Sequence, residues 1–206
     1  DGSFMLYARG QDVFVDCGMY GYVKDGYQNY VRSANAHNTV VVDGGSYPLT
    51  PAAMSLVGFQ GHRFLPAYDW VEVFNRAYEG VSIRRRFLSS RDATVLIDWV
   101  ESQTEHTYSQ LFHLGELVEV LSASDSEVLL HGTSAAVGHA LPAVFDPGQP
   151  GQAGLWTAVQ GRKPSCGMPN PEIRFGWDRG AVDYRHHHRG GGRERSVTRW
   201  LIGTGL

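Results

Sequence analysis

The sequence predicts an all-β protein, an antiparallel β-sandwich of many short strands with little or no helix. Short runs rich in β-branched and aromatic residues recur along the whole chain, as they do in strands. Turn residues separate these runs at close intervals, and glycine is frequent, with 25 among 206 residues. The apolar spacing that marks an amphipathic helix is nearly absent. Together these observations are typical of a sandwich or a barrel, and we expect the sandwich.

The expected strands follow one another from the first residues to the last. The run from Val81 to Phe87 alternates apolar with polar residues, which predicts a strand with one solvent-facing side. Arg91 and Asp92 predict the hairpin turn that follows it. The runs are Ser3 to Ala8, Val13 to Asp16, Thr39 to Val42, Trp70 to Phe74, Val81 to Leu88, Ala93 to Val100, Thr107 to Leu114, Leu117 to Leu121, Glu127 to Leu130, Leu155 to Val159 and Val197 to Ile202.

Three stretches predict loops, because they are rich in glycine, proline or repeated polar residues. They are Tyr20 to Tyr30, Phe145 to Gly151, and the basic stretch Arg185 to Arg195 with its three histidines. A single helical turn is expected at Pro51 to Met54. We find no internal repeat. A chain of 206 residues can hold one large all-β domain or two small ones, and we expect a single domain over residues 1–206.

Composition excludes several classes of protein. The net charge of −3 argues against a general nucleic-acid binder, and an acidic ligand would need a local basic patch. No stretch approaches the ~20 apolar residues of a membrane-spanning helix. Cys17 and Cys166 are too few for a disulfide framework; they form either one bridge or, as we expect, two separate thiols. The chain begins at Asp1 and ends just after a strand-like run, so we expect it to be a fragment of a longer protein.

The segment from Ala36 to Gly44 is the most informative motif. His37 and Asn38 stand at the head of a β-branched run, which closes on an Asp-Gly turn. Upstream, the apolar run Val13 to Val15 ends on the carboxylate of Asp16. If these two strand ends are neighbours, they bring together an imidazole and a carboxylate, which form much of a metal site.

The same segment resembles the heparinase II/III-like family, which comprises bacterial polysaccharide lyases of the heparinase and alginate lyase kind. The resemblance lies in Arg32 to Val40 with Asp43-Gly44, in Asp1-Gly2-Ser3-Phe4, and in Val15-Asp16-Cys17-Gly18. Thr94 to Val100 and His106 to Leu114 resemble later strands, so the likeness reaches about Gly115. It implies that residues 1–206 are the C-terminal β-sandwich domain, and that an N-terminal helical toroid lies outside this chain.

The resemblance also implies a zinc site. In the family a zinc ion in the sandwich is held by a histidine, an aspartate and a second histidine. The aspartate corresponds to Asp16 and the second histidine to His37. The first histidine, and a catalytic histidine, would precede Asp1. The other interpretation is that Asp16 caps a turn and that His37 bonds to a neighbouring strand.

Tyrosines are the candidates for catalysis. A lyase must remove the C5 proton of a uronate and protonate the departing O4, and tyrosine can do both. Tyr20, Tyr22, Tyr27 and Tyr30 share the stretch between the two candidate ligands, and we name Tyr22 and Tyr30. Packing of the loop is the alternative for each.

Arg32 and Asn38 are the candidates for substrate binding. The planar fork of Arg32 suits a carboxylate or a sulfate, unless the arginine forms a surface ion pair with Asp25 or Asp43. The side chain of Asn38 should face away from His37. We expect it to hold the Tyr20–Tyr30 loop through backbone hydrogen bonds rather than to contact substrate.

We expect the remaining arginines and histidines to have structural roles rather than catalytic or ligand-binding roles. Alternation places Arg85 on the face opposite Arg84 and Arg86, which we expect to be solvated. His106 and His113 should be hydrogen-bonded core or rim residues, and the consecutive histidines 186–188 have no fixed geometry.

Two functions follow from the residues and the resemblance. The first is the C-terminal domain of a polysaccharide lyase that cleaves an acidic, uronate-containing glycan, with the isolated fragment inactive. The second is a non-catalytic carbohydrate-binding or structural module of bacterial surface-polysaccharide metabolism. The expected partners are an acidic polysaccharide and the N-terminal helical domain, and a periplasmic or secreted parent protein is favoured.

Overall fold

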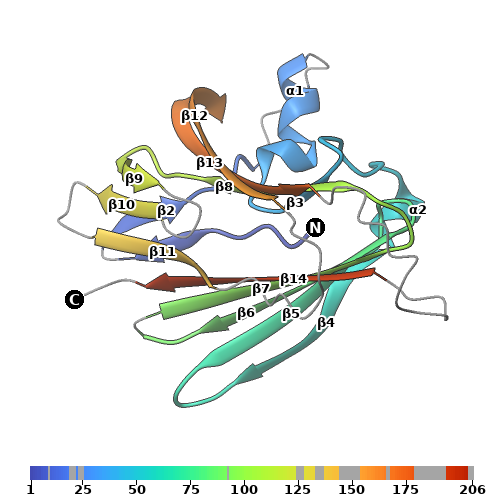
Figure 1. The fold of residues 1–206 in the computed structure, drawn as a ribbon, viewed down its shortest axis with the longest axis horizontal. Coiled ribbons are helices and arrows are strands. Elements are labelled where there is room, and N and C mark those ends of the chain that lie inside the picture. Colours follow the sequence, from blue (N-terminus) through green and yellow to red (C-terminus); the bar gives the residue numbers. More distant parts are fainter. Residues whose placement is uncertain are drawn as a thin grey trace.

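The structure, a computed structural model, is an antiparallel β-sandwich, and this confirms the predicted fold class (Figure 1). It describes residues 1–8, 10–18, 22, 26–91, 93–123, 128–132, 137–143, 154–165, 168–178 and 194–203, and beyond residue 132 it describes the course of the backbone. Two main layers face each other, and the N-terminus lies between them (Figure 1).

The larger layer is an eight-stranded sheet with the strand order β4-β5-β6-β7-β14-β11-β10-β9. Its first four strands form a meander of antiparallel hairpins, in which Arg85 of β6 pairs with Asp98 of β7. The strands are β4 (Val57–Phe64), β5 (Asp69–Asn75), β6 (Val81–Ser89), β7 (Ala93–Ser102), β9 (Val118–Ala123), β10 (Val128–Gly132), β11 (Val137–Ala143) and β14 (Glu194–Gly203).

The smaller layer is a four-stranded sheet with the order β12-β13-β8-β3. It consists of β12 (Gly154–Ser165), β13 (Met168–Asp178), β8 (Thr107–His113) and β3 (Val40–Val42). A hairpin of β1 (Leu6–Ala8) and β2 (Gln11–Phe14) runs beside β8. Val15 N donates to His113 O at 2.9 Å, and Gly115 N donates to Val13 O at 3.0 Å. Gly115 allows this approach, because a Cβ there would lie 2.0 Å from Asp12 O.

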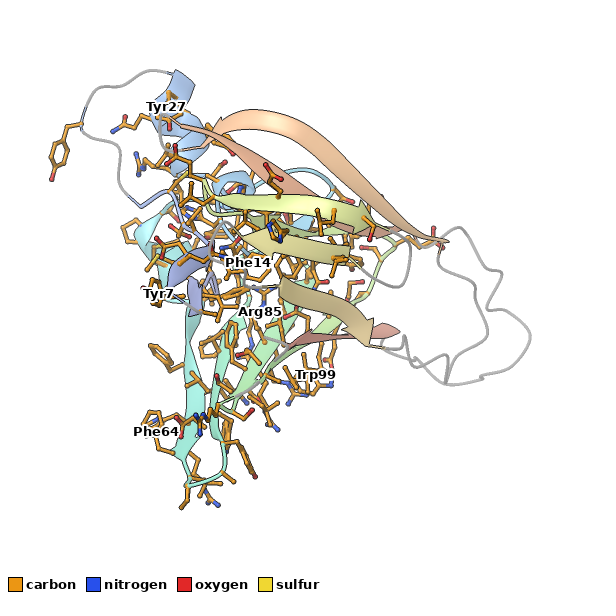
Figure 2. The ribbon with its side chains drawn as sticks, turned by 90° about the vertical axis from the view of Figure 1, so that its left-hand side faces the viewer. Tyr7, Phe14, Tyr27, Phe64, Arg85 and Trp99 are labelled. Atoms are coloured by element: carbon orange, nitrogen blue, oxygen red, sulfur yellow. The ribbon has the colours of Figure 1, made fainter. Side chains whose placement is uncertain are left out.

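The core lies between the two layers as two apolar clusters. One joins Val40 and Leu111 of the smaller sheet to Ile83 of the larger sheet. The other surrounds Phe14, whose ring lies 5.4 Å from that of Phe112 (Figure 2). The first cluster includes β3 and the second includes the end of β2, and so the segments that carry Asp16 and His37 leave the core from a rigid base.

The eleven expected strands all correspond to observed strands, with boundaries that shift by a few residues. The structure adds β4, β11 and β13, which the sequence did not predict. The hairpin between β6 and β7 is confirmed. So is the turn after β3, where Asp43 and Gly44 have φ values of 50° and 69°, as the tight hairpin turn with two left-handed residues requires.

Helix is sparse, but one helix lies where a loop was expected. The single turn at Pro51–Met54 is confirmed as α2, and Ala53 N donates to its N-cap residue Thr50. The prediction of a loop from Tyr20 to Tyr30 is wrong at its second half, because Gly26–Val31 forms α1. A 3-10 turn, η1 (Ala34–Ala36), follows it. Burial of Val31 against the core stabilises α1 despite its weak helix formers.

Several predictions concern residues outside the described ranges. They include Tyr20, Asp25, Cys166, the turn cluster at Phe145–Gly151 and the histidines 186–188. None of the helices in the described part of the chain has the length and the apolar character to cross a membrane. The expected domain boundaries stay a prediction.

Candidate functional site

A pocket of about 770 Å³ opens where the N-terminal segment, the end of β2, α1 and α2 meet. Four of the residues predicted from sequence line it, namely Asp16, His37, Tyr22 and Arg32. Tyr47 and the exposed apolar side chains of Leu49 and Met54 also line it. With Asp1, which also lines it, the pocket therefore combines two carboxylates, an imidazole, two phenol groups and one guanidinium with an apolar wall.

Asp16 and His37 are direct neighbours, as predicted from the two strand ends. His37 Nδ1 lies 2.9 Å from Asp16 Oδ2. Both side chains are about one-fifth exposed, at 17% for His37 and 20% for Asp16. Because Nδ1 is engaged by the carboxylate, Nε2 is the ring nitrogen left for a ligand or for proton transfer.

Local structure explains how each strand end presents its side chain. After β2, Asp16 Oδ1 accepts a hydrogen bond from Gly18 N at 2.9 Å, a turn that Gly18 permits with its φ of 60°. Before β3, the 3-10 turn η1 ends at His37, whose N donates to Ala34 O. The turn-capping role that the alternative interpretation gave to Asp16 fits this contact, and the same carboxylate also holds His37.

Ser3 joins the N-terminal segment to this pair. Its hydroxyl donates to Asp16 Oδ2 at 2.5 Å and accepts from Asn38 N at 3.1 Å. Ser3 N in turn donates to Asp1 Oδ1. The other oxygen of Asp1 accepts from the Tyr47 hydroxyl at 2.9 Å. The N-terminal segment thus forms one wall of the pocket.

These contacts shift the pKa values of two groups. Burial would raise the pKa of Asp16, but hydrogen bonds from His37, Ser3 and Gly18, with the charge of His37, outweigh it and hold that pKa well below its usual range. Burial, with the nearby Tyr78 and Asp16, raises the pKa of Tyr47 to about 12. At neutral pH the pocket therefore holds an ionised Asp16 beside a protonated Tyr47.

Asn38 has a different role from the one expected. Its side chain is fully buried. It donates to Phe4 O at 2.7 Å and to Val15 O at 2.8 Å, and it accepts from His113 N at 2.6 Å. It therefore joins the N-terminal segment, β2 and β8 rather than the Tyr20–Tyr30 stretch. The substrate-binding role predicted for Asn38 does not fit this burial, since every polar atom of its amide faces protein.

A buried arginine of the larger sheet, Arg85, also contacts the segments that form the pocket. Arg85, which is 3% exposed, forms a bidentate pair with Asp98 at 2.7 and 2.8 Å. Its Nη1 donates to Gly2 O at 2.9 Å and to Asn38 O at 2.6 Å. Gln110 Nε2 donates to the same carboxylate. Figure 2 shows Arg85 between the layers. Sequence alternation predicted the face of Arg85 but not its contact with the pocket wall.

The two named tyrosines lie in different environments. Tyr22 lines the pocket and is 87% exposed. The Tyr30 hydroxyl is buried, and the residue does not line the pocket. Its ring lies 6.3 Å from that of Tyr27 within α1. Tyr22 is therefore accessible at the pocket, and its catalytic role stays a prediction, whereas the packing role left open for Tyr30 fits its position.

Arg32 is the cation of the pocket. It is exposed at the end of α1 and forms no ion pair with the described residues. Asp43, one of its two expected alternative partners, instead lies 2.7 Å from His106 Nδ1. His113 is buried and His106 is hydrogen-bonded at the rim, which confirms the structural role predicted for both.

Ser3, Tyr47 and Arg85 are the residues of the site that sequence reasoning missed. Asp1-Gly2-Ser3-Phe4 was one of the matching segments, and this is the only signal that pointed to Ser3. The contacts of Tyr47 and Arg85 join residues 46 and 47 positions apart. No local pattern in the sequence reports such pairs.

The described residues fit only part of a zinc site. Carboxylate oxygen and imidazole nitrogen are both ligands that zinc accepts, and Asp16 and His37 are adjacent. Among the residues that the structure describes, however, no group of three histidine, cysteine, aspartate or glutamate side chains could hold a metal ion. A zinc site at this pair would need further ligands.

Comparison with known proteins identifies the family. The sequence profile described as "Heparinase II/III-like, C-terminal" matches residues 1–163. The chain therefore belongs to the heparinase II/III-like C-terminal family. Among curated proteins no sequence matches it.

Solved structures support the fold. A heparinase III gene product superposes with a TM-score of 0.73 at 15% identity, covering 99% of this chain and 30% of that one. The heparan sulfate lyase HepC from Pedobacter heparinus gives a TM-score of 0.73 at 14% identity, covering 100% and 30%. A structure described as heparinase III gives 0.69 at 18%, covering 100% and 30%. The chain thus spans about a third of these proteins.

Proposed function

We propose that this chain is the C-terminal domain of a polysaccharide lyase that cleaves an acidic, uronate-containing glycan by β-elimination. Its pocket at Asp16 and His37 then forms part of the substrate cleft. The observation that carries the proposal is the placement of the Asp16–His37 pair, Tyr22 and Arg32 around one pocket. Membership of the heparinase II/III-like family supports the same reaction class.

The residues match the demands of the reaction. A base removes the proton at C5 of the uronate, and the electrons of that bond stay on C5, where the neutralised carboxylate stabilises them. These electrons form the C4–C5 double bond as the C4–O4 bond breaks, and O4 leaves with the electrons of that bond and a proton supplied by an acid. Arg32 can bind both carboxylate oxygens of the uronate and so acidify the C5 proton. The hydroxyl of Tyr22 and Nε2 of His37 would transfer the protons.

Asp16 acts on this reaction through His37. Its carboxylate holds the imidazole by Nδ1, which fixes the ring orientation and the tautomer. If a zinc ion were bound by this pair with further ligands, it would add positive charge beside the substrate carboxylate, and His37 Nε2 would then be a ligand rather than a proton-transfer group. The further ligands and the remaining catalytic groups would come from outside the described residues.

A non-catalytic carbohydrate-binding module is the second candidate. The exposure of Tyr22 and Arg32 at the pocket supports it. In such a module Tyr22 and Arg32 would bind an acidic sugar without proton transfer. The two candidates differ in one observable, the formation of an unsaturated product.

The test is an assay of the intact parent protein with alginate, heparan sulfate and other acidic glycans. β-Elimination produces an unsaturated uronate, which raises the ultraviolet absorbance. His37→Ala should lower turnover roughly 10²-fold or more, while His62→Ala, an exposed histidine of β4 outside the pocket, should leave it unchanged. If the parent protein forms no unsaturated product from any acidic glycan, the lyase is excluded and the binding module takes its place.

A further inference from the structure

A second surface rich in arginine and tryptophan lies on the outer side of the larger sheet. Trp70 of β5, Arg84 and Arg86 of β6 and Trp99 of β7 alternate with the core-facing residues of their strands. We call these four residues, with Glu72, the outer arginine face. Figure 2 shows Trp99 on the far side of the sheet from the upper layer, with Arg85 between the layers. The face is therefore separate from the pocket.

Stacking holds the two guanidinium groups in place. Arg84 Cζ lies 4.3 Å from the ring centroid of Trp99. Arg86 Cζ lies 4.9 Å from the ring of Trp70 and 5.6 Å from that of Trp99. A stacked guanidinium uses its flat face and keeps its in-plane N–H donors for other partners. Because the side chains are already ordered, an anion that binds them costs little conformational entropy.

Glu72 forms an ion pair within the outer arginine face but does not cancel the positive charge of that face. The carboxylate is 5% exposed and accepts from Arg86 Nε at 2.7 Å. Arg84 Nη1 is 4.0 Å away, at the limit of an ion pair. The side chains of Arg84 and Arg86 remain 41% and 36% exposed. Arg84 therefore has donors that Glu72 does not use.

The face carries an excess of positive charge on an acidic protein. Arg63 joins it by pairing with Trp70 across β4 and β5, and Arg76 stacks 5.0 Å over the neighbouring ring of Phe74. Among the described side chains on and beside β4 to β7, four arginines thus share one side of the sheet with two glutamates, Glu72 and Glu101. The chain as a whole carries −3. Such a local reversal of charge attracts polyanions to one face.

We propose that the outer arginine face binds a segment of an acidic polysaccharide, at a site remote from the pocket. Carboxylate or sulfate groups of the polymer accept in-plane hydrogen bonds from Arg84 and its neighbours. The identity of the polymer rests on the proposed function, whereas the site itself rests on charge and stacking. Nucleic acid fits less well, because arginines cover the tryptophan rings on which bases would stack.

The test measures retention of the intact protein by immobilised heparan sulfate and alginate at 4 °C, with dextran as an uncharged polymer. Arg84→Gln should weaken retention by roughly tenfold, as expected for one lost charge-assisted contact. Arg91→Gln is the matched control, because it removes the same charge from an exposed turn. Arg86 still pairs with Glu72 in the Arg84→Gln variant, so the fold should be preserved. Arg84→Lys should recover only part of the affinity, since lysine lacks the planar fork.

The outcomes separate this site from the pocket. Equal retention of Arg84→Gln and wild type overturns the outer site, as does an equal loss in Arg91→Gln. Equal retention by DNA would overturn the choice of glycan. If unsaturated product forms but Arg84→Gln is retained normally, only this site fails. If no product forms but retention depends on Arg84, the site stands and the proposed lyase activity fails.

Discussion

Arg85 of β6 donates a 2.6 Å hydrogen bond to the carbonyl oxygen of Asn38, 47 residues earlier in the chain. The contact crosses the space between the two layers and ends next to His37. The same Nη1 also donates to Gly2 O, beside Ser3. One guanidinium therefore joins both walls of the pocket to the larger sheet, so the geometry of the Asp16–His37 pair depends on a residue outside the pocket.

The first prediction concerns the stability that this arginine provides. Arg85→Met should lower the free energy of unfolding by about 3–5 kcal/mol, because Asp98 is fully buried and would lose its only charged partner among the described residues, keeping the neutral amide of Gln110. Arg84→Met on the opposite face should cost about 1 kcal/mol, as expected for a partly exposed cation. Urea unfolding of both variants measures the difference. Equal losses would contradict a special role for the buried pair.

The second prediction concerns the pH dependence of stability. The pKa of Asp16 is lowered in the folded state, so its contribution is present above the ordinary aspartate pKa and is lost as pH falls through the folded value. Wild type should therefore exceed Asp16→Asn in unfolding free energy at neutral pH, and the gap should shrink below about pH 4.

Asp43→Asn is the control for that measurement. Burial would raise the pKa of Asp43, but hydrogen bonds from His106 and Thr107, with the charge of His106, together outweigh it and lower that pKa. Its side chain is 56% exposed, so solvent screens the pair and the variant should lose at most about 1 kcal/mol. A gap between wild type and Asp16→Asn that stays constant from pH 7 to about pH 2 would show that Asp16 does not titrate as the structure indicates.

The fold could be predicted where strands are apolar and β-branched, and it was missed where they are not. β4 contains Gly58 and Gly61 and is largely exposed, so it lacks the pattern of a buried strand. The structure gives a reason for both glycines. A Cβ at Gly61 would lie 3.1 Å from the ring of Trp70, and one at Gly58 would lie 3.3 Å from that of Phe74. The rings of β5 need this space, and no local signal in β4 reports it.

The residues of the candidate site likewise divide into those that could be predicted from the sequence and those that could not. Asp16 and His37 could be predicted, because each directly flanks an apolar run and matches a family motif. The contacts of Tyr47 and Ser3 could not, since they arise only when the N-terminal segment packs against β2 and β3. The burial of Asn38 depends on three segments that meet at one amide, which a strand pattern does not predict.

The third prediction tests that amide. Asn38→Ala should lower the free energy of unfolding by roughly 2–5 kcal/mol, because it leaves Phe4 O, Val15 O and His113 N without a buried partner. Asn35→Ala is the matched control, since that side chain makes one long bond of 3.3 Å to Gly44 O, and it should cost about 0.5 kcal/mol. Thermal and urea unfolding decide the matter. A small effect at Asn38 would show that water replaces its contacts.

The last prediction separates the two tyrosines named from sequence. Tyr22 lines the pocket and is exposed, whereas the Tyr30 hydroxyl is buried away from it. In the intact parent protein, Tyr22→Phe should lower turnover roughly 10²-fold, because it removes a proton-transfer group and little else. Tyr30→Phe should change turnover by less than about threefold and should act on stability instead.

Each substitution removes only a hydroxyl, so the two variants control for each other. Turnover follows from the absorbance of the unsaturated product, and stability from urea unfolding. If Tyr30→Phe abolishes turnover while Tyr22→Phe retains it, the catalytic hydroxyl comes from α1, and the pocket described by Asp16 and His37 is not where the proton is transferred.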